Sequence, residues 1–191
     1  MATWVNKKDL PPPAPGTHTI FLFVMTQNYE AQVELENDLA KACTVRGIKT
    51  VKSVDAFGAI LTQDKLPKKE VLLKAISDLG CDMLFSVALV DEKSETHYTP
   101  GTSAGMYSPY GGYGYFYGGY YAYAPTYYTP GYYTTDKTYF IESNLYDIKT
   151  EKLLISMQSK VVNPPAVDKG SQQYTDMLVK ELIAQGVMKQ Q

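Results

Sequence analysis

Two stretches of this chain are apolar at nearly every position, and they restrict its fold more than any other feature. One covers Thr19–Met25 and the other covers Met83–Val90. A strand with one face in water alternates apolar and polar residues, whereas a short continuous apolar run is typical of a strand buried on both faces. Both stretches are therefore predicted to be central strands of a sheet.

Helical patterns separate and follow these two runs. Asn28 can cap a helix over about residues 29–46, and Gly47 would end it. A second helix is expected between Pro67 and Gly80, and a third begins at Ser171. The residues predicted to face the sheet are Ala31, Leu35, Leu39, Ala42 and Cys43 in the first helix, Val71, Leu72, Ala75, Ile76 and Leu79 in the second, and Tyr174, Met177, Leu178, Leu182 and Ile183 in the third.

Three further segments have the patterns of strands. Residues 48–54 alternate in character, which favours an edge strand, and residues 137–146 and 153–162 flank a polar turn. The element order β-α-β-α-β-β-β-α predicts an α/β fold with a mixed five-stranded sheet and helices packed on it. Right-handed crossovers would make the first three strands parallel, and the expected spatial order is 2-1-3-4-5.

The length of 191 residues fits a single α/β domain over residues 17–191. Residues 1–16 are polar and end in a proline-rich run, which excludes helix and the interior of a sheet. That segment is either a tether between an attachment point and the domain or an arm packed on the domain through Trp4.

A Tyr/Gly-rich insert at about residues 100–134 interrupts the domain. It contains no charged residue, and its glycines make ordering costly in entropy. Three interpretations stay open: a loop without specific function, a recognition surface built from tyrosine, and a self-associating segment.

The recognition hypothesis predicts a ligand site at the carboxyl ends of the parallel strands, where sites of open α/β sheets gather. The loop after the first strand and the insert after the third would both lie there. The predicted ligand-binding residues are Asn28, Tyr29, His97, Tyr107, Tyr110, Tyr113, Tyr115, Tyr117, Tyr120 and Tyr121.

Composition argues against several classes of function. The formal charge of −2 gives no basic surface for nucleic acid, and no glycine-rich loop joins a strand to a helix for phosphate binding. The chain has two histidines, and Glu95 with His97 on one strand face would supply only two metal ligands. We therefore predict no catalytic residues, metal or cofactor.

The two cysteines, Cys43 and Cys81, fall at apolar positions, which predicts buried free thiols, with a disulfide as the alternative. No apolar run is long enough for a membrane-spanning helix, and the first eight residues do not resemble a signal peptide. The chain is then either cytoplasmic or the mature form of an exported protein.

Four motifs resemble the α/β domain shared by the amino-terminal part of TolB, the curli-secretion CsgG family and the LpoB-type peptidoglycan-synthase activators. They are the strand Thr19–Phe23, the turn Arg46–Lys49, the strand opening Gly80–Phe85 and the hairpin Leu145–Leu154. Glu151 stands where that family usually has glycine, so the type of turn can differ. The resemblance covers roughly residues 17–188 apart from the insert.

This resemblance implies a bacterial cell-envelope lipoprotein, with a lipid-bearing cysteine upstream of Ala2 followed by the proline-rich tether. We expect outer-membrane anchoring, facing the periplasm or the surface, with a cytoplasmic location as the alternative. The expected function is a non-enzymatic module that binds an envelope protein or peptidoglycan and other glycans. The alternative is an assembly subunit that self-associates into homo-oligomers.

Overall fold

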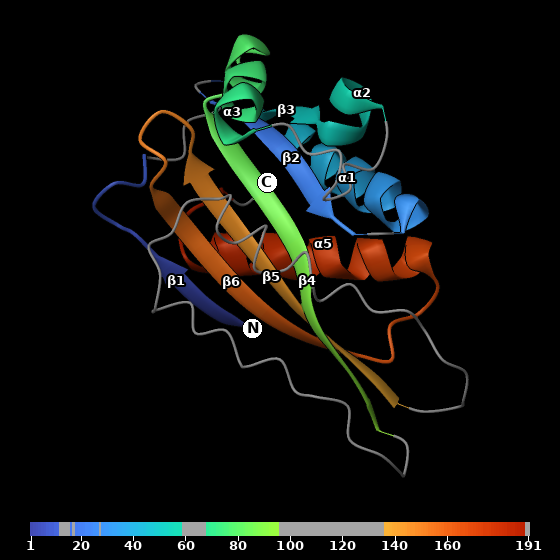
Figure 1. The fold of residues 1–191 in the computed structure, drawn as a ribbon. Coiled ribbons are helices and arrows are strands. Elements are labelled where there is room, and N and C mark those ends of the chain that lie inside the picture. The colour runs from blue at the N-terminus through green and yellow to red at the C-terminus, as the bar shows by residue number, and fades with distance from the viewer. Residues whose placement is uncertain (12–15, 17, 27, 59–67, 96–135, 190–191) are drawn as a thin grey trace.

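The chain folds around one mixed β-sheet. The computed structural model describes residues 1–11, 16, 18–26, 28–58, 68–95 and 136–189. Within these ranges the sheet has six strands in the order β1-β6-β5-β4-β2-β3 (Figure 1). The strands are β1 (Ala2–Val5), β2 (Thr19–Met25), β3 (Lys49–Lys52), β4 (Met83–Glu95), β5 (Asp136–Asp147) and β6 (Leu153–Val162).

The predicted α/β class is confirmed, and so is the parallel arrangement of the first three predicted strands. β2 pairs in parallel with both β3 and β4, and the remaining pairs are antiparallel. The predicted number of five strands was wrong. Residues 2–5 form a sixth strand on the open edge of β6, with Trp4 opposite Ser156, so the spatial order has one more member than expected. The other five strands keep the expected relative order.

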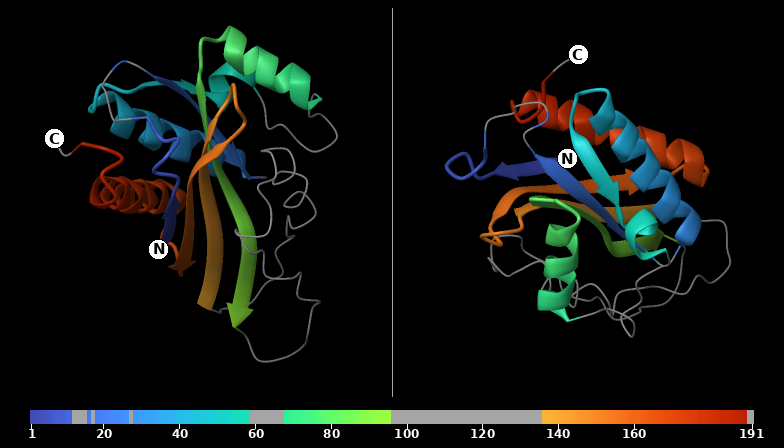
Figure 2. Two further views of the ribbon diagram at one scale, coloured as in Figure 1. Left: turned by 90° about the vertical axis from the view of Figure 1, so that its left-hand side faces the viewer. Right: turned by 90° about the horizontal axis from the view of Figure 1, so that it is seen from above.

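Helices cover both faces of this sheet, as Figure 2 shows. On one face α1 (Tyr29–Thr44) and α5 (Val167–Ala184) lie side by side. They bury a core that includes Leu22, Phe85 and Leu178. On the other face α3 (Lys69–Asp78) supplies Leu72 and Ile76 to a second core. Two-sided coverage explains why β2 and β4 are apolar at consecutive positions.

A buried carboxylate fixes α1 to the edge of the sheet. Glu36 is 0% exposed and accepts hydrogen bonds from the Val24 amide (3.1 Å), the Val54 amide (3.1 Å) and the Ser53 hydroxyl (2.5 Å). The predicted inner stripe of α1 was therefore incomplete: Leu35 packs against the core and Leu39 is buried in it, as expected, but the buried polar residues Gln32 and Glu36 were not predicted. A carboxylate with this many donors is tolerated in the interior.

The same cluster explains why the second predicted strand is shorter than expected. The pattern predicts a strand over residues 48–54, but β3 ends at Lys52 and the short helix α2 (Ser53–Phe57) follows. Ser53 and Val54 turn toward Glu36 instead of continuing the edge of the sheet. Gly58 ends α2 with a φ of 68°, which glycine adopts without strain.

Two other helix predictions need correction. In α3, Leu72 and Ile76 are buried as expected, but Val71 and Leu79 are exposed. α5 begins at Val167, four residues before the predicted start. Ser171, the predicted start, is instead buried within the helix and donates to Asp38 of α1 at 2.6 Å. This bond joins the two helices that share a face of the sheet.

The hairpin between β5 and β6 has Glu151 at the position where the resembling family usually has glycine. Glu151 has a φ of 55°, which lies in the left-handed region that favours glycine. Asp147 stabilises the turn by accepting from the Thr150 amide (2.6 Å) and hydroxyl (2.7 Å). The predicted hairpin is confirmed, and its turn holds a non-glycine residue in a strained conformation.

Candidate functional site

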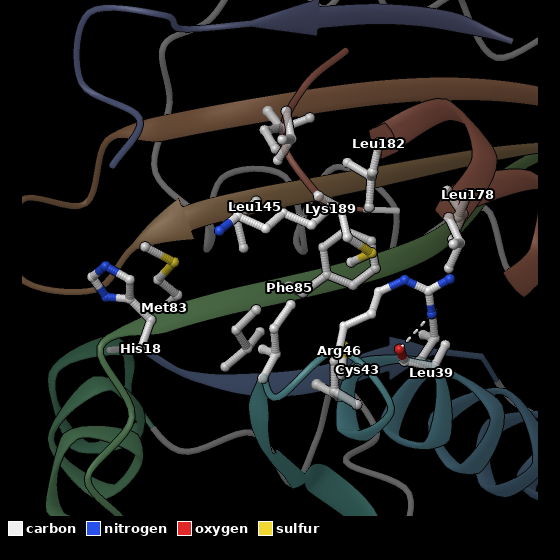
Figure 3. Close-up of a pocket in the computed structure, with 18 of the residues that line it drawn as sticks. His18, Leu39, Cys43, Arg46, Met83, Phe85, Leu145, Leu178, Leu182 and Lys189 are labelled. Carbon is white, nitrogen blue, oxygen red and sulfur yellow. Dashed lines mark hydrogen bonds between the residues drawn. The ribbon is translucent and has the colours of Figure 1, made fainter. Parts of the chain in front are cut away.

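A cavity of about 130 Å³ lies between the sheet and the helices α1 and α5 (Figure 3). Its floor is formed by the α1/α5 face of the strands, where residues of β2, β4, β5 and β6 present large apolar side chains. The strand residues that line it are Ile20, Leu22, Met83, Phe85, Leu145 and Ile155. Leu39, Ala42 and Cys43 of α1 form one wall, and Leu178, Val179 and Leu182 of α5 form the other.

Segments from both ends of the chain complete the cavity. After α5, Gly186 takes a φ of 70° and the chain turns back, so that the Val187 and Met188 amides both donate to the Leu182 carbonyl (2.9 and 3.1 Å). Val187, Met188 and Lys189 thereby line the cavity, as do Leu10 and Pro11 from the amino-terminal segment. The Gly16 amide donates to the Gly47 carbonyl at 3.0 Å, which ties that segment to the end of α1.

The polar groups of the lining are all of one kind. Among the described residues that line the cavity, His18, Arg46 and Lys189 are basic and none is acidic. Arg46 is half-buried and Lys189 is exposed. Figure 3 shows both side chains among the apolar lining residues: the Arg46 guanidinium lies between Leu39 and Leu178, whereas the Lys189 amine is directed the other way, toward Leu145.

The guanidinium of Arg46 has only part of its hydrogen-bonding capacity satisfied. Its Nη1 donates to the carbonyl of Ala42 at 2.8 Å, in the last turn of α1, where the helix dipole favours a cation. Its Nε is buried and has no hydrogen-bond partner. A buried unpaired donor of a charged group costs free energy, and such groups are uncommon in native structures.

His18, the third basic residue of the lining, has a structural partner. Its Nδ1 contacts the carboxylate of Asp82, whose other oxygen accepts from the Thr19 amide at 2.8 Å. Asp82 thus joins the beginning of β2 to the beginning of β4. Asp82 belongs to the Gly80–Phe85 motif, and here its role is to connect two neighbouring strands.

No reacting group is visible in the described lining. Burial raises the pKa of the Cys43 thiol to about 11, so this thiol stays neutral and serves as an apolar wall. In the described part of the chain both cysteines are free and buried, as predicted, and no cluster of three His, Cys, Asp or Glu side chains could hold a metal ion. The arrangement is suited to binding an apolar group.

The sequence-based site lies elsewhere. Asn28 caps α1, with its Oδ1 accepting from the Ala31 amide at 3.1 Å, and Tyr29 is 48% exposed. Neither lines the cavity, whose nearest lining residue on this helix is Leu39, about 16 Å along the helix axis from Asn28. The other predicted residues lie outside the described residues: His97, Tyr107, Tyr110, Tyr113, Tyr115, Tyr117, Tyr120 and Tyr121.

The described ends of β4 and β5 show where the insert is attached. The last described pair of this ribbon is Glu95 with Asp136. β2 ends at Met25, opposite Ala88, so β4 continues for seven residues beyond it, roughly 23 Å (Figure 1). The base of the insert and the Asn28 end of α1 are therefore at different heights along the sheet.

Sequence reasoning missed the cavity and its cations. In the sequence, Arg46 marks the end of the predicted helix over residues 29–46 and the start of a turn motif, and Lys189 belongs to no motif. The one available signal was an arginine directly after an apolar helix stripe, which is a weak pattern. The cavity forms because residues 10, 46 and 189 lie around the same space in the fold, and local periodicity cannot predict contacts between segments so far apart in the sequence.

These features define a small α/β domain with an apolar internal cavity whose lining includes three basic residues. No family model and no curated protein sequence matches the chain. Among solved structures, a PelC variant from Paraburkholderia phytofirmans that forms a dodecamer covers 99% of this chain and 100% of its own, at 8% identity and a TM-score of 0.51. This likeness shows that the two proteins share a fold.

Two bacterial lipoproteins are more distant structural neighbours. Lipoprotein GNA1162 from Neisseria meningitidis covers 88% of this chain and 96% of its own, at 10% identity and a TM-score of 0.43. A minor lipoprotein from Acinetobacter baumannii covers 84% and 91%, at 7% identity and a TM-score of 0.28. At these scores neither neighbour carries a conclusion about this chain. In the described ranges no helix has the length and apolarity needed to cross a membrane.

Proposed function

We propose that this chain is a non-enzymatic binding module of the bacterial cell envelope that holds an apolar group in the cavity between the sheet, α1 and α5. The observation that carries the proposal is an apolar, partly enclosed space of about 130 Å³ in the larger of the two cores. Protein interiors are otherwise packed to nearly crystalline density, so a space of this size is unusual.

The size of the cavity decides what it can hold. An engineered apolar cavity of about 150 Å³ in another protein stays dry and binds benzene. The present cavity therefore suits a benzene-sized group or a short stretch of alkyl chain. Apolar lining with a few polar groups is also the usual composition of a small-molecule site.

A cavity-filling substitution tests this proposal. In Ala42→Leu the added side chain occupies the cavity, and Thr44→Leu adds the same side chain at an exposed position of α1. We expect octanoate or 1-octanol to shift the amide NMR signals of Leu22, Phe85 and Leu145 in the wild type and in Thr44→Leu. Both ligands should leave these signals unmoved in Ala42→Leu.

The proposal is overturned if neither ligand shifts these signals in the wild type. It is also overturned if Ala42→Leu responds as the wild type does, because the ligand would then bind elsewhere. A thermal melt of each variant establishes that the fold is retained before the titration.

The Tyr/Gly-rich insert adds a second element to the proposal. We propose that it contacts an envelope protein or a glycan, since tyrosine offers a large amphipathic surface at little rotamer cost. Deleting residues 102–133 should leave the unfolding transition of the domain intact and abolish retention of the chain by peptidoglycan or envelope fractions. Unchanged retention would exclude the insert as the binding surface.

Assembly into homo-oligomers is the second candidate function. The PelC structure that shares this fold is a dodecamer. Sedimentation of the full chain over a hundredfold range of concentration should show oligomers if the chain assembles, and a constant monomer if it only binds. We also propose that the domain is related to the TolB, CsgG and LpoB-type domains and that a lipid anchors the chain to the outer membrane. A lipobox cysteine encoded directly upstream of Ala2 would test the anchor.

A further inference from the structure

The cations beside the cavity indicate the chemistry of the ligand's polar end. An apolar ligand alone would need only the aliphatic lining, and a neutral lining would serve it best. Instead, Arg46 and Lys189 approach the cavity from the segments that follow α1 and α5, and the described lining contains no carboxylate to neutralise them. A ligand that carries a negative charge at one end would complement this arrangement.

Of the two cations, Arg46 gives the more specific indication of where an anionic group would bind. Its Nη1 is held by the Ala42 carbonyl, so the direction of the guanidinium is fixed, while its buried Nε lacks an acceptor. A carboxylate or phosphate oxygen near Nε would satisfy that donor with a charge-assisted hydrogen bond. Lys189 is exposed on a flexible stem and adds a second positive charge to the cavity lining.

We propose that the ligand is an anionic single-chain amphiphile, with its alkyl end in the cavity and its head group on Arg46, while Lys189 contributes a second positive charge to the same lining. The inference rests on the proposed function, because it assumes that the cavity is occupied by an apolar group. The head group is a carboxylate, as in a fatty acid, or a phosphate, as in a single-chain phospholipid. Both share the anionic oxygen that Arg46 would bind.

Ligands that share an eight-carbon chain and differ in the head group test the inference. Isothermal titration of the full chain with octanoate, octyl phosphate, 1-octanol and octyltrimethylammonium compares two anions, a neutral head and a cation. We expect at least one anion to bind about tenfold or more tightly than octanol, which corresponds to one charge-assisted hydrogen bond. The cation should bind more weakly than octanol, and the tighter anion identifies the source of the head group.

Arg46→Met and Lys189→Met connect the preference to the named side chains. Arg46→Met should remove most of the difference between the anion and octanol while the affinity for octanol changes less than about threefold. Lys189→Met should reduce the difference by a smaller factor, because an exposed charge is screened by solvent. Lys180→Met, at an exposed position outside the cavity lining, is the matched control and should keep the full preference.

The outcomes separate the inference from the proposed function. Equal binding of octanol and both anions would overturn the anionic head group while leaving the apolar site in place. An anion preference that persists in Arg46→Met would also overturn it. If none of the four ligands binds, the proposed function fails together with the inference.

Discussion

Glu36 lies within α1 and Arg46 lies just after it, and these two charged residues have opposite surroundings. Glu36 is 0% exposed, and its carboxylate accepts from two amides and a hydroxyl that belong to β2 and the start of α2. Arg46 lies half-buried beside a cavity, with one nitrogen bonded to Ala42 and a buried Nε that lacks a partner.

The difference distinguishes a structural charge from a candidate binding charge. When the hydrogen bonds of a buried charged group are all made within its own chain, the group stabilises the fold and has no free hydrogen-bonding capacity for a ligand. A buried donor without a partner lowers stability in the free protein, and a ligand can recover that cost. We therefore expect substitutions at Glu36 to change stability and substitutions at Arg46 to change binding.

The largest expected effect is the loss of stability in Glu36→Ala. This change leaves the Val24 and Val54 amides and the Ser53 hydroxyl without their acceptor, and it opens space in the interior. We expect the free energy of unfolding to fall by about 3 kcal/mol or more, measured by urea denaturation. Glu30→Ala, on the exposed first turn of the same helix, should cost less than about 1 kcal/mol. Equal effects at the two positions would contradict a structural role for the cluster.

The second effect is a pH dependence that originates at Glu36. Burial raises the pKa of this carboxyl above its ordinary value of 4.5, and the hydrogen bonds from Ser53, Val24 and Val54 oppose that shift only in part. A raised pKa in the folded state means that the folded protein binds the proton more tightly. The stabilising contribution is complete below pH 4.5 and is lost as the pH rises through the folded-state pKa.

Urea denaturation of the wild type and Glu36→Gln between about pH 4 and 8 isolates this contribution, because all other groups are common to both proteins. The free energy of unfolding of the wild type minus that of Glu36→Gln should decrease as the pH rises above 4.5. A difference that stays constant would show that hydrogen bonding cancels the effect of burial on the Glu36 pKa, and one that increases with pH would show that hydrogen bonding outweighs burial.

The smallest expected effect is the change in stability of Arg46→Met. The substitution removes one hydrogen bond to the Ala42 carbonyl but also removes the unpaired Nε, and methionine retains an unbranched apolar stem. These terms oppose each other, so the free energy of unfolding should change by less than about 1 kcal/mol. A loss comparable to that of Glu36→Ala would mean that Arg46 is a structural charge as well, and the contrast between the two residues would disappear.

Much of the fold could be predicted because its elements have local signals. The continuous apolar runs of β2 and β4, the Asn28 cap and the β5–β6 hairpin are each encoded within a few neighbouring residues. The predictions failed where a residue far along the chain intervened. β3 is short because Ser53 and Val54 bond to Glu36, and residues 2–5 form a strand of only four residues by pairing with the edge of β6.

By itself, the sequence determined the α/β class, the parallel central strands and the unusual composition of residues 100–134. Periodicity and capping are properties of short segments, so they can be recognised without knowing what those segments contact in the fold. The tertiary structure alone decided that Arg46, Lys189 and Leu10 surround one apolar cavity. Such a site depends on the turn at Gly186 and on the packing of α1 against α5, and these bring together residues that are distant in the sequence.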